Sequence, residues 1–170
     1  AEFNNETMKF SVQLGQWKYF GAPIGNFGVE YTYRAAIALG GLGANTVDVA
    51  LYMKTDDDDS GKMLTDEKNY VLHFEAFPPI RKGGFWSVTA YGSDDFLIAN
   101  PIDRYCINDR SNFVLNEDGS LDIILSKVQP DNIANWLPVS GTAFHFILRV
   151  YMPDMEALAT WQSPVIRVLN

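Results

Sequence analysis

The chain has 170 residues, 47% of them apolar and 14% aromatic, with 13 basic against 21 acidic side chains and a net charge of −8. A single domain of this size buries enough surface to fold without disulfides or metals. The basic residues are dispersed, with Arg81-Lys82 as the one adjacent pair, whereas nucleic acids and anionic membranes bind clustered cations. The composition therefore argues against both kinds of partner.

The compartment stays open at this level. Cys106 is the one cysteine of the chain, so no internal disulfide forms. No run approaches the roughly 18 apolar residues of a membrane-spanning helix. We expect a soluble protein, either cytoplasmic or exported with its signal absent from this sequence.

We interpret residues 1–24 as an N-terminal arm or a cloning remnant, and residues 25–170 as one domain. The segment YTYRAAIALGGL, residues 31–42, predicts a helix, because its alanines favour helix and its apolar residues recur on one stripe. Gly40, Gly41 and Gly43 then supply residues that accept the positive φ of a helix end.

Strand patterns dominate the rest of the chain. β-branched and aromatic residues are concentrated in separate segments, several of which alternate apolar and polar side chains. Turn-forming groups lie between these segments, so the pattern predicts an antiparallel sandwich or barrel. Short helices are expected at residues 132–136 and 154–160. The predicted strands cover residues 47–54, 69–77, 85–91, 96–98, 121–125, 143–151 and 165–169.

Several blocks in order along the chain carry a family resemblance: FGVEYTYRAAIALGGLGAN, YVLHFEAFPP, FWSVTAYGSDDFLIANPIDRYCINDR, NEDGSLDI, ANWLP and FILRVYMP. Over residues 25–168 the chain resembles domain of unknown function 1214, the C-terminal half of a tandem family whose N-terminal half is domain of unknown function 1254. The resemblance implies a mostly β fold, an antiparallel β-sandwich of jelly-roll type, here with one N-terminal helix and short C-terminal helices. It implies no settled reaction or cofactor.

The densest polar block is NPIDRYCINDR, residues 100–110. Arg104 and Arg110 are candidate ligand-binding residues there, because a guanidinium binds a carboxylate through two parallel hydrogen bonds. Tyr105 and Asp109 of the same block are candidate catalytic residues. The alternative is structural: a buried Arg–Asp pair pins a long connection between the sheets. Cys106, inside the block, is interpreted as a small core residue.

Asn135 and Trp136 place an amide beside a large ring, a pair that suits the stacking and hydrogen bonding of a sugar. They are therefore further candidates for ligand binding. The structural alternative is that Trp136 fills one end of the sandwich while Asn135 closes a turn.

His73 is the best single candidate for general acid–base catalysis, because the pKa of an imidazole lies near neutrality. His73, Glu75 and His145 would together imitate the two-histidine, one-carboxylate metal triad. Their spacing matches no complete metal motif.

The segment DDDDSGKMLTDE, residues 56–67, has the spacing of a calcium-binding loop, with Asp56, Asp58, Ser60 and Glu67 as candidate ligands. The flanking segments are predicted strands, whereas such a calcium loop joins two helices. A hairpin loop with a solvated acidic tip explains the same residues. No cofactor is predicted, and calcium is kept as the weaker alternative.

Two functions follow from these observations. The first is a binding or assembly module, homo-oligomeric or paired with a second β domain, because aromatic residues on both faces of the strands imply an interface as well as a core. The second is an enzyme acting on a small polar or anionic substrate in a pocket lined by Arg, Tyr, Asn and His. No nucleophile motif identifies a reaction.

Overall fold

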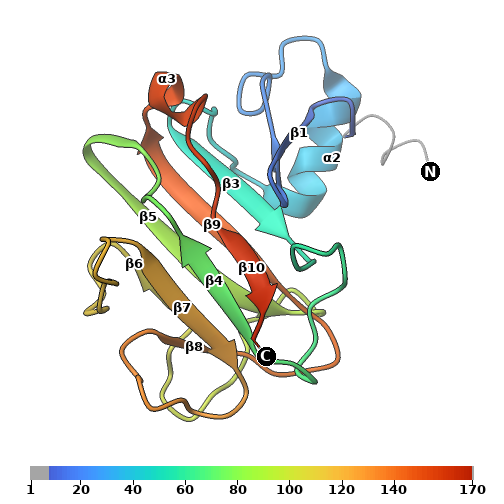
Figure 1. Cartoon of the computed structure of the whole chain (residues 1–170). Coiled ribbons are helices and arrows are strands. Elements are labelled where there is room, and N and C mark those ends of the chain that lie inside the picture. Colours follow the sequence, from blue (N-terminus) through green and yellow to red (C-terminus); the bar gives the residue numbers. More distant parts are fainter. Residues whose placement is uncertain (1–7, 170) are drawn as a thin grey trace.

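The computed structural model describes residues 8–169 and shows two β-sheets packed face to face, with helix α2 (Tyr31–Gly41) at one edge (Figure 1). The larger sheet has six strands in the order β1-β2-β3-β9-β5-β6, and the smaller has four in the order β10-β4-β7-β8. The strands are β1 (Ser11–Leu14), β2 (Trp17–Phe20), β3 (Ala50–Thr55), β4 (Tyr70–Phe74), β5 (Ile80–Gly92), β6 (Cys106–Asn108), β7 (Leu121–Ser126), β8 (Trp136–Pro138), β9 (Phe144–Pro153) and β10 (Val165–Val168).

Every strand pair is antiparallel except β7 with β8. The prediction of a mostly β chain is therefore confirmed, with an antiparallel larger sheet and a smaller sheet that is mixed. The predicted helix at residues 31–42 is confirmed as α2. A second short helix, α3 (Met155–Leu158), begins after Asp154, whose side chain accepts hydrogen bonds from two backbone N–H groups of the first turn. Within residues 8–169, no helix has the length and apolar character that a membrane crossing requires.

Two-residue alternation along the strands builds the core between the sheets. Strand register places Met53, Leu148, Val88 and Ile107 in one row across β3, β9, β5 and β6, and each is at most 1% exposed. Side chains of β4 and β7 face them from the smaller sheet and are equally buried. The next residue along each strand of the larger sheet therefore points away from the core.

The N-terminal hairpin of β1 and β2 extends the larger sheet beside β3. Trp17 of this hairpin is completely buried, and its indole Nε1 donates a hydrogen bond of 2.7 Å to the carbonyl of Pro164. Helix α2 has a small core of its own, in which Tyr33 and Ile37 pack with Ile24. The phenol of Tyr33 lies 4.3 Å from the ring of Phe10.

Some expectations differ from the structure. Residues 132–136 do not form a helix: this segment enters β8, where Trp136 pairs with Ile124 and is buried, so tertiary pairing overrides the local pattern. The expected strand at residues 96–98 is reduced to one bridge between Leu97 and Tyr91. Strands β1, β2, β6 and β8 were not predicted. Of the expected N-terminal arm, residues 1–7 lie outside the described part of the chain, and β1 and β2 come from the remainder.

Candidate functional site

The outer face of the larger sheet, the face turned away from the core, carries an unusual set of polar and aromatic side chains. Register places Tyr52, Arg149 and Ser87 in one row across β3, β9 and β5. The neighbouring row holds Lys54, Ile147 and Thr89. Directly opposed residues of neighbouring strands share one face of a sheet, so these six side chains form one surface.

Arg149 occupies the middle of this surface and is half-buried. Its Nη1 donates a 3.3 Å hydrogen bond to the Thr89 hydroxyl, and its Nη2 donates one of 2.8 Å to the Tyr91 hydroxyl. The guanidinium carbon also lies 5.6 Å from the centre of the Tyr91 ring, in cation–π range. Both of these hydrogen bonds therefore go to neutral acceptors.

A cleft of about 640 Å³ opens between this surface and the C-terminal end of α2. Arg149, Lys54 and Tyr52 lie on the sheet side of the cleft. Its apolar lining includes Phe20, Ile24, Ile37, Leu39, Leu42 and Ile147. We call it the Arg149 cleft. Its volume is in the range of pockets that hold small molecules.

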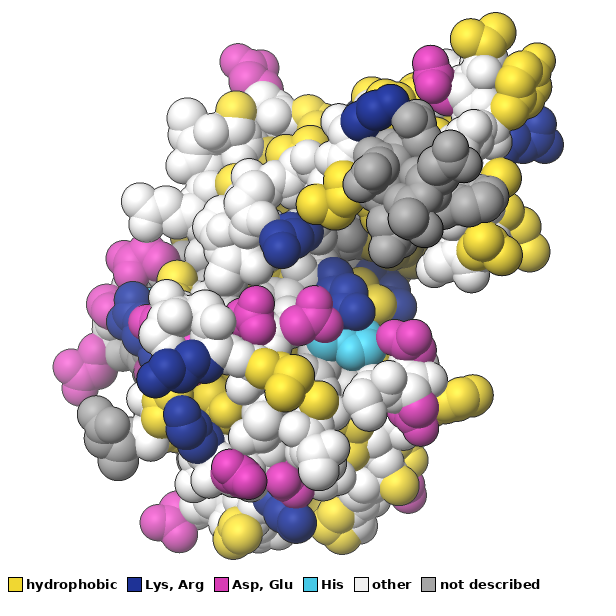
Figure 2. All heavy atoms as spheres, turned by 90° about the vertical axis from the view of Figure 1, so that its right-hand side faces the viewer, with side chains coloured by type: hydrophobic (Ala, Val, Ile, Leu, Met, Phe, Trp, Pro, Cys, Tyr) yellow, Lys and Arg dark blue, Asp and Glu magenta, His cyan; other side chains and the backbone are white. Residues whose placement is uncertain are grey.

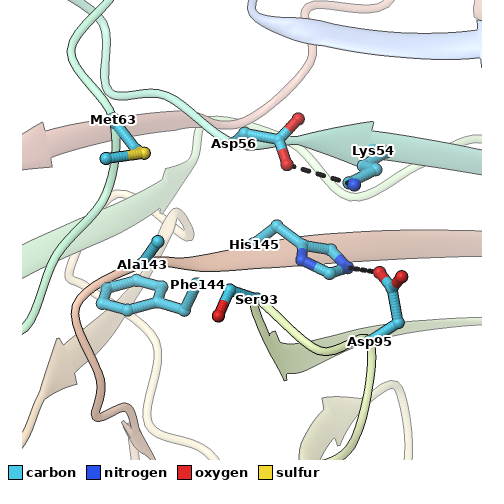
Figure 3. A pocket seen from close by; sticks show the side chains of 8 residues that line it. All are labelled: Lys54, Asp56, Met63, Ser93, Asp95, Ala143, Phe144 and His145. Atoms are coloured by element: carbon cyan, nitrogen blue, oxygen red, sulfur yellow. Dashed lines mark ion pairs between the residues drawn. The ribbon is translucent and has the colours of Figure 1, made fainter.

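A second, smaller hollow of about 250 Å³ adjoins it and shares Lys54 (Figure 3). We call it the His145 pocket. The imidazole of His145 is 4% exposed, stacks on the Tyr91 ring at 5.6 Å, and has Nε2 3.4 Å from a carboxylate oxygen of Asp95. Lys54 pairs with Asp56 at 3.1 Å on the opposite side of the pocket. Burial, followed by the nearby Lys54 cation, lowers the pKa of His145.

Tyr91 contacts one lining residue of each hollow, because it stacks on His145 of the His145 pocket and accepts a hydrogen bond from Arg149 of the Arg149 cleft. Figure 2 looks at the side of the molecule that carries α2 in Figure 1, and there a histidine lies next to basic and acidic side chains. The outer face thus combines fixed cations, hydroxyl groups and apolar walls, which is the composition of a site for an anion with an apolar body.

Arg104, a sequence-predicted ligand-binding residue, lies outside both hollows. Its Nη1 donates to the backbone carbonyls of Ile133, Ala134 and Trp136 at 2.5, 3.3 and 2.9 Å. Arg104 thus holds the segment before β8 in place, through carbonyls and not through the expected aspartate. As in the structural alternative, Arg104 pins a connection of the chain, but its partners are backbone carbonyls and not an aspartate.

The other candidates of that block are also dispersed. The Tyr105 hydroxyl donates a 3.0 Å hydrogen bond to Asp103, which raises the pKa of Tyr105. Asp109 is exposed, and the guanidinium carbon of exposed Arg110 lies 5.9 Å from the centre of the Phe85 ring. None of the three lines either hollow.

Asn135 and Trp136 are buried, at 4% and 1% exposure. The Asn135 amide accepts from the backbone N–H of Val114 at 2.7 Å and donates to the carbonyls of Val114 and Asp122 at 2.7 and 2.9 Å. The Trp136 indole donates to the Ser126 carbonyl at 3.0 Å. Both side chains bind the protein's own backbone and present no free face to a sugar.

His73 lies on the outer face of the smaller sheet, away from His145. Its Nδ1 is 2.6 Å from Asp122, and its Nε2 is 3.4 Å from Glu75. The hydrogen bond with Asp122 is the main reason that the pKa of His73 is raised. The metal triad built from both histidines is wrong in geometry, because β4 and β9 belong to different sheets. Among residues 8–169, no group of three or more His, Cys, Asp or Glu side chains is arranged to hold a metal.

The acidic segment forms a tight loop. One carboxylate oxygen of buried Asp58 accepts hydrogen bonds from the Ser60 backbone, the Ser60 hydroxyl and the Lys62 backbone at 2.9, 2.6 and 3.0 Å. Asp56 pairs with Lys54, and Glu67 is exposed. The hairpin-loop interpretation explains this arrangement, since the central carboxylate already closes its own turn.

Sequence reasoning missed the Arg149 cleft. Alternation along β9 does place His145, Ile147, Arg149 and Tyr151 on one face. What the sequence could not give is the register that brings Tyr52 from β3 and Tyr91 from β5 beside them. One signal in the sequence could have indicated this site. The strand β9 is strongly apolar on one face, which is typical of a central strand, and yet carries polar side chains on its other face.

The comparisons with known proteins fit this fold. Residues 49–155, more than half of the chain, match the family model described as a protein of unknown function, DUF1214. A crystal structure of a protein from Vibrio parahaemolyticus is similar at 30% identity and a TM-score of 0.69, covering 82% of this chain and 35% of that one. An uncharacterized protein from Burkholderia cenocepacia is similar in fold, with 19% identity, a TM-score of 0.50, and coverage of 81% and 33%.

The present chain thus spans about a third of the length of these two structures. A comparison with curated proteins finds no match. The matched residues run from the strand before the acidic loop to α3 and include Arg149, Lys54, Tyr91 and His145. On the strength of this match, the chain belongs to the DUF1214 family of proteins of unknown function.

Proposed function

We propose that the chain is an assembly module that packs, through the surface around α2, against a second β domain. The observation that carries the proposal is the exposure of apolar side chains there. Val29, Tyr31, Leu39 and Leu42 are 71–87% exposed, and we call these four residues the α2 apolar surface. Among the other described residues, only Phe96 and Val128 are large apolar side chains of comparable exposure.

The length of the relatives supports the same proposal. In the Vibrio and Burkholderia proteins about two thirds of the chain lies outside the part that matches this one. A concentration of exposed apolar side chains on one segment is typical of a surface that a partner covers. A second β domain, as in the tandem arrangement that the family resemblance implies, supplies such a partner.

We further propose that the sandwich is of the jelly-roll type. The chain passes from one sheet to the other between β3 and β4, β4 and β5, β6 and β7, β8 and β9, and β9 and β10. Such repeated crossing supports the jelly-roll assignment over a meander, in which successive strands stay in one sheet.

The alternative function, an enzyme for a small anionic substrate, receives less support. Its expected residues His73, Arg104 and Arg110 lie on separate parts of the molecule and line neither hollow. A pocket enzyme requires its acid–base and substrate-binding groups within reach of one cavity.

Light scattering of the isolated chain tests the assembly proposal. With no second domain present, the α2 apolar surface is expected to cause self-association at tens of micromolar. The double variant Leu39→Ser, Leu42→Ser should shift the population to the monomer, whereas the control Val128→Ser, which removes an equally exposed side chain elsewhere, should not. A strict monomer in all three proteins would count against the proposal.

A second check uses the Vibrio relative. We expect the residues of its structure that superimpose on Leu39 and Leu42 to be buried against the rest of that chain. If they face solvent there, the α2 apolar surface is not where a second domain packs.

A further inference from the structure

The Arg149 cleft contains a charge that the protein leaves without a counter-charge. Within the described residues 8–169, the ion pairs of the chain do not include Arg149, although acidic side chains outnumber basic ones overall. A half-buried guanidinium bonded only to neutral hydroxyls keeps part of its desolvation cost. A bound anion would remove that cost.

The guanidinium is held in a fixed position before any ligand arrives. Thr89 and Tyr91, both on β5, hold its two terminal nitrogens, and the Tyr91 ring supports it from one side. Tyr52 is its direct neighbour on β3, and the Asn45 amide donates a 3.0 Å hydrogen bond to the Tyr52 hydroxyl. Rigid strands and satisfied neighbours reduce the entropy that an arginine loses on binding a carboxylate.

Lys54 provides a second cation at the same cleft. Its ammonium pairs with Asp56, and both side chains are about half-exposed, so this ion pair is weak and readily exchanged for another anion. The acidic groups nearby, Asp56 and Asp95, line the His145 pocket and are absent from the lining of the Arg149 cleft. The positive charge therefore lies on the side where α2 forms the opposite wall.

That opposite wall is apolar. Leu39 and Ile37 of α2 and Leu42, directly after this helix, line the cleft on this side. Phe20 and Ile24 line it from β2 and the connection that follows. A ligand that places its charge on Arg149 would bury the rest of its body among these side chains, and the burial of each methylene group favours binding. Apolar walls with a cation on the floor fit a molecule that is anionic at one end only.

We propose that the Arg149 cleft binds a small amphipathic carboxylate, with the carboxylate on Arg149 and Lys54 and the aliphatic or aromatic body along α2. This inference does not depend on a second domain. Leu39 and Leu42 belong both to the cleft wall and to the α2 apolar surface, so the ligand proposal is tested at Arg149 and Lys54, which are not part of that surface.

Isothermal titration calorimetry with octanoate tests the proposal, and 1-octanol is the neutral probe of the same length. Octanoate is expected to bind at one site per chain, more tightly than 1-octanol, and more weakly as salt is raised. Arg149→Gln should weaken octanoate binding by at least about tenfold, in keeping with the loss of a charged hydrogen bond, and leave 1-octanol unchanged. Arg110→Gln, which removes an exposed arginine from the turn after β6, outside the cleft, is the matched control.

The remaining variants keep the test decisive. Arg149→Lys retains the positive charge but lacks the two parallel N–H donors of a guanidinium, and it should bind octanoate with intermediate affinity. This variant separates a lost ligand contact from a disturbed fold. If Arg149→Gln does not fold, Lys54→Met provides the second charge deletion, with a smaller loss expected. Absence of saturable octanoate binding to the unaltered chain overturns the proposal, and so does equal affinity for octanoate and 1-octanol.

The two proposals fail separately. Loss of self-association in Leu39→Ser, Leu42→Ser reports on the assembly surface, and Arg149→Gln should leave that self-association unchanged. If octanoate binds as expected while the chain is a strict monomer, the ligand site stands without the assembly function.

Discussion

The outer faces of the two sheets carry one histidine each, and their surroundings have opposite effects. On the smaller sheet His73 contacts Asp122 and Glu75, and the pKa of its imidazole is raised. On the larger sheet His145 is buried beside Tyr91 near Lys54, and the pKa of its imidazole is lowered. One face therefore stabilises positive charge on its histidine, and the other disfavours it. The difference teaches that the same residue type meets opposite electrostatic surroundings on the two faces.

The two regions also differ in how they use polar groups. Next to the smaller sheet, the Asn135 amide is fully occupied by backbone groups of Val114 and Asp122. On the larger sheet, Arg149 contacts hydroxyls and borders open space. Asn135 thus binds the protein's own backbone, whereas Arg149 borders the cleft that is the proposed ligand site.

The largest expected effect tests this division. Asn135→Ala leaves three backbone groups without their buried partner and should lower the free energy of unfolding by about 2–4 kcal/mol. Asn45→Ala, the control next to the larger sheet, removes one exposed contact to Tyr52 of β3 and should change the free energy of unfolding by less than about 0.5 kcal/mol. Urea denaturation measures both. Equal losses would erase the distinction between the two regions.

A smaller effect concerns His145 and pH. Because its pKa in the folded protein is lower than in the unfolded chain, the unfolded state takes up more protons as pH falls below about 6.5. Stability associated with neutral His145 is thus fully present above that pH and is lost as the pH drops towards the lower, folded-state pKa. Between pH 7.5 and pH 5, the melting temperature of His145→Gln should therefore fall by less than that of the unaltered chain. A parallel decline in both proteins would contradict the lowered pKa.

The smallest expected effect concerns His73. Its raised pKa means that the stabilisation by Asp122 is present below about pH 6.5 and is lost as the pH rises through the folded-state pKa. Asp122→Asn should lower the pKa of His73 in an NMR titration and leave His145 unaffected. The accompanying change in stability should be small, because both partners are partly exposed. If Asp122→Asn changed the pKa of His145 and not that of His73, this account of the two histidines would be wrong.

The sequence predicts those features of the fold that depend on neighbouring residues better than those that depend on pairing between distant segments. Within the predicted strand at residues 143–151, two-residue alternation places Phe146, Leu148 and Val150 on one face and Arg149 on the other, and in the structure the first three are buried in the core. The sequence carries this information because the two-residue period is a local property. The helix at residues 31–42 followed from alanine content and terminal glycines. Strand β8 was missed because its pairing with β7 is parallel and involves only three residue pairs.

The candidate site required information that no local pattern holds. Tyr91 meets His145 only because β5 pairs with β9 in one particular register, more than 50 residues apart in sequence. The polar block at residues 100–110 attracted attention because its charges are adjacent in sequence, yet Arg104 is occupied by carbonyls. Residues that are adjacent in the sequence of the polar block thus do not form a common site, whereas residues far apart in sequence do come together on the larger sheet.

The anchoring of the N-terminal hairpin has a consequence for how the chain folds. Trp17 bonds to Pro164, the Gln16 side chain accepts from the backbone of Ile166, and the Ser163 hydroxyl donates to the Leu14 carbonyl. These contacts join segments separated by 147 to 150 positions, so their formation must close a very long loop. High contact order of this kind slows folding. During synthesis the hairpin therefore cannot reach its final packing until the ribosome has released Pro164 to Ile166.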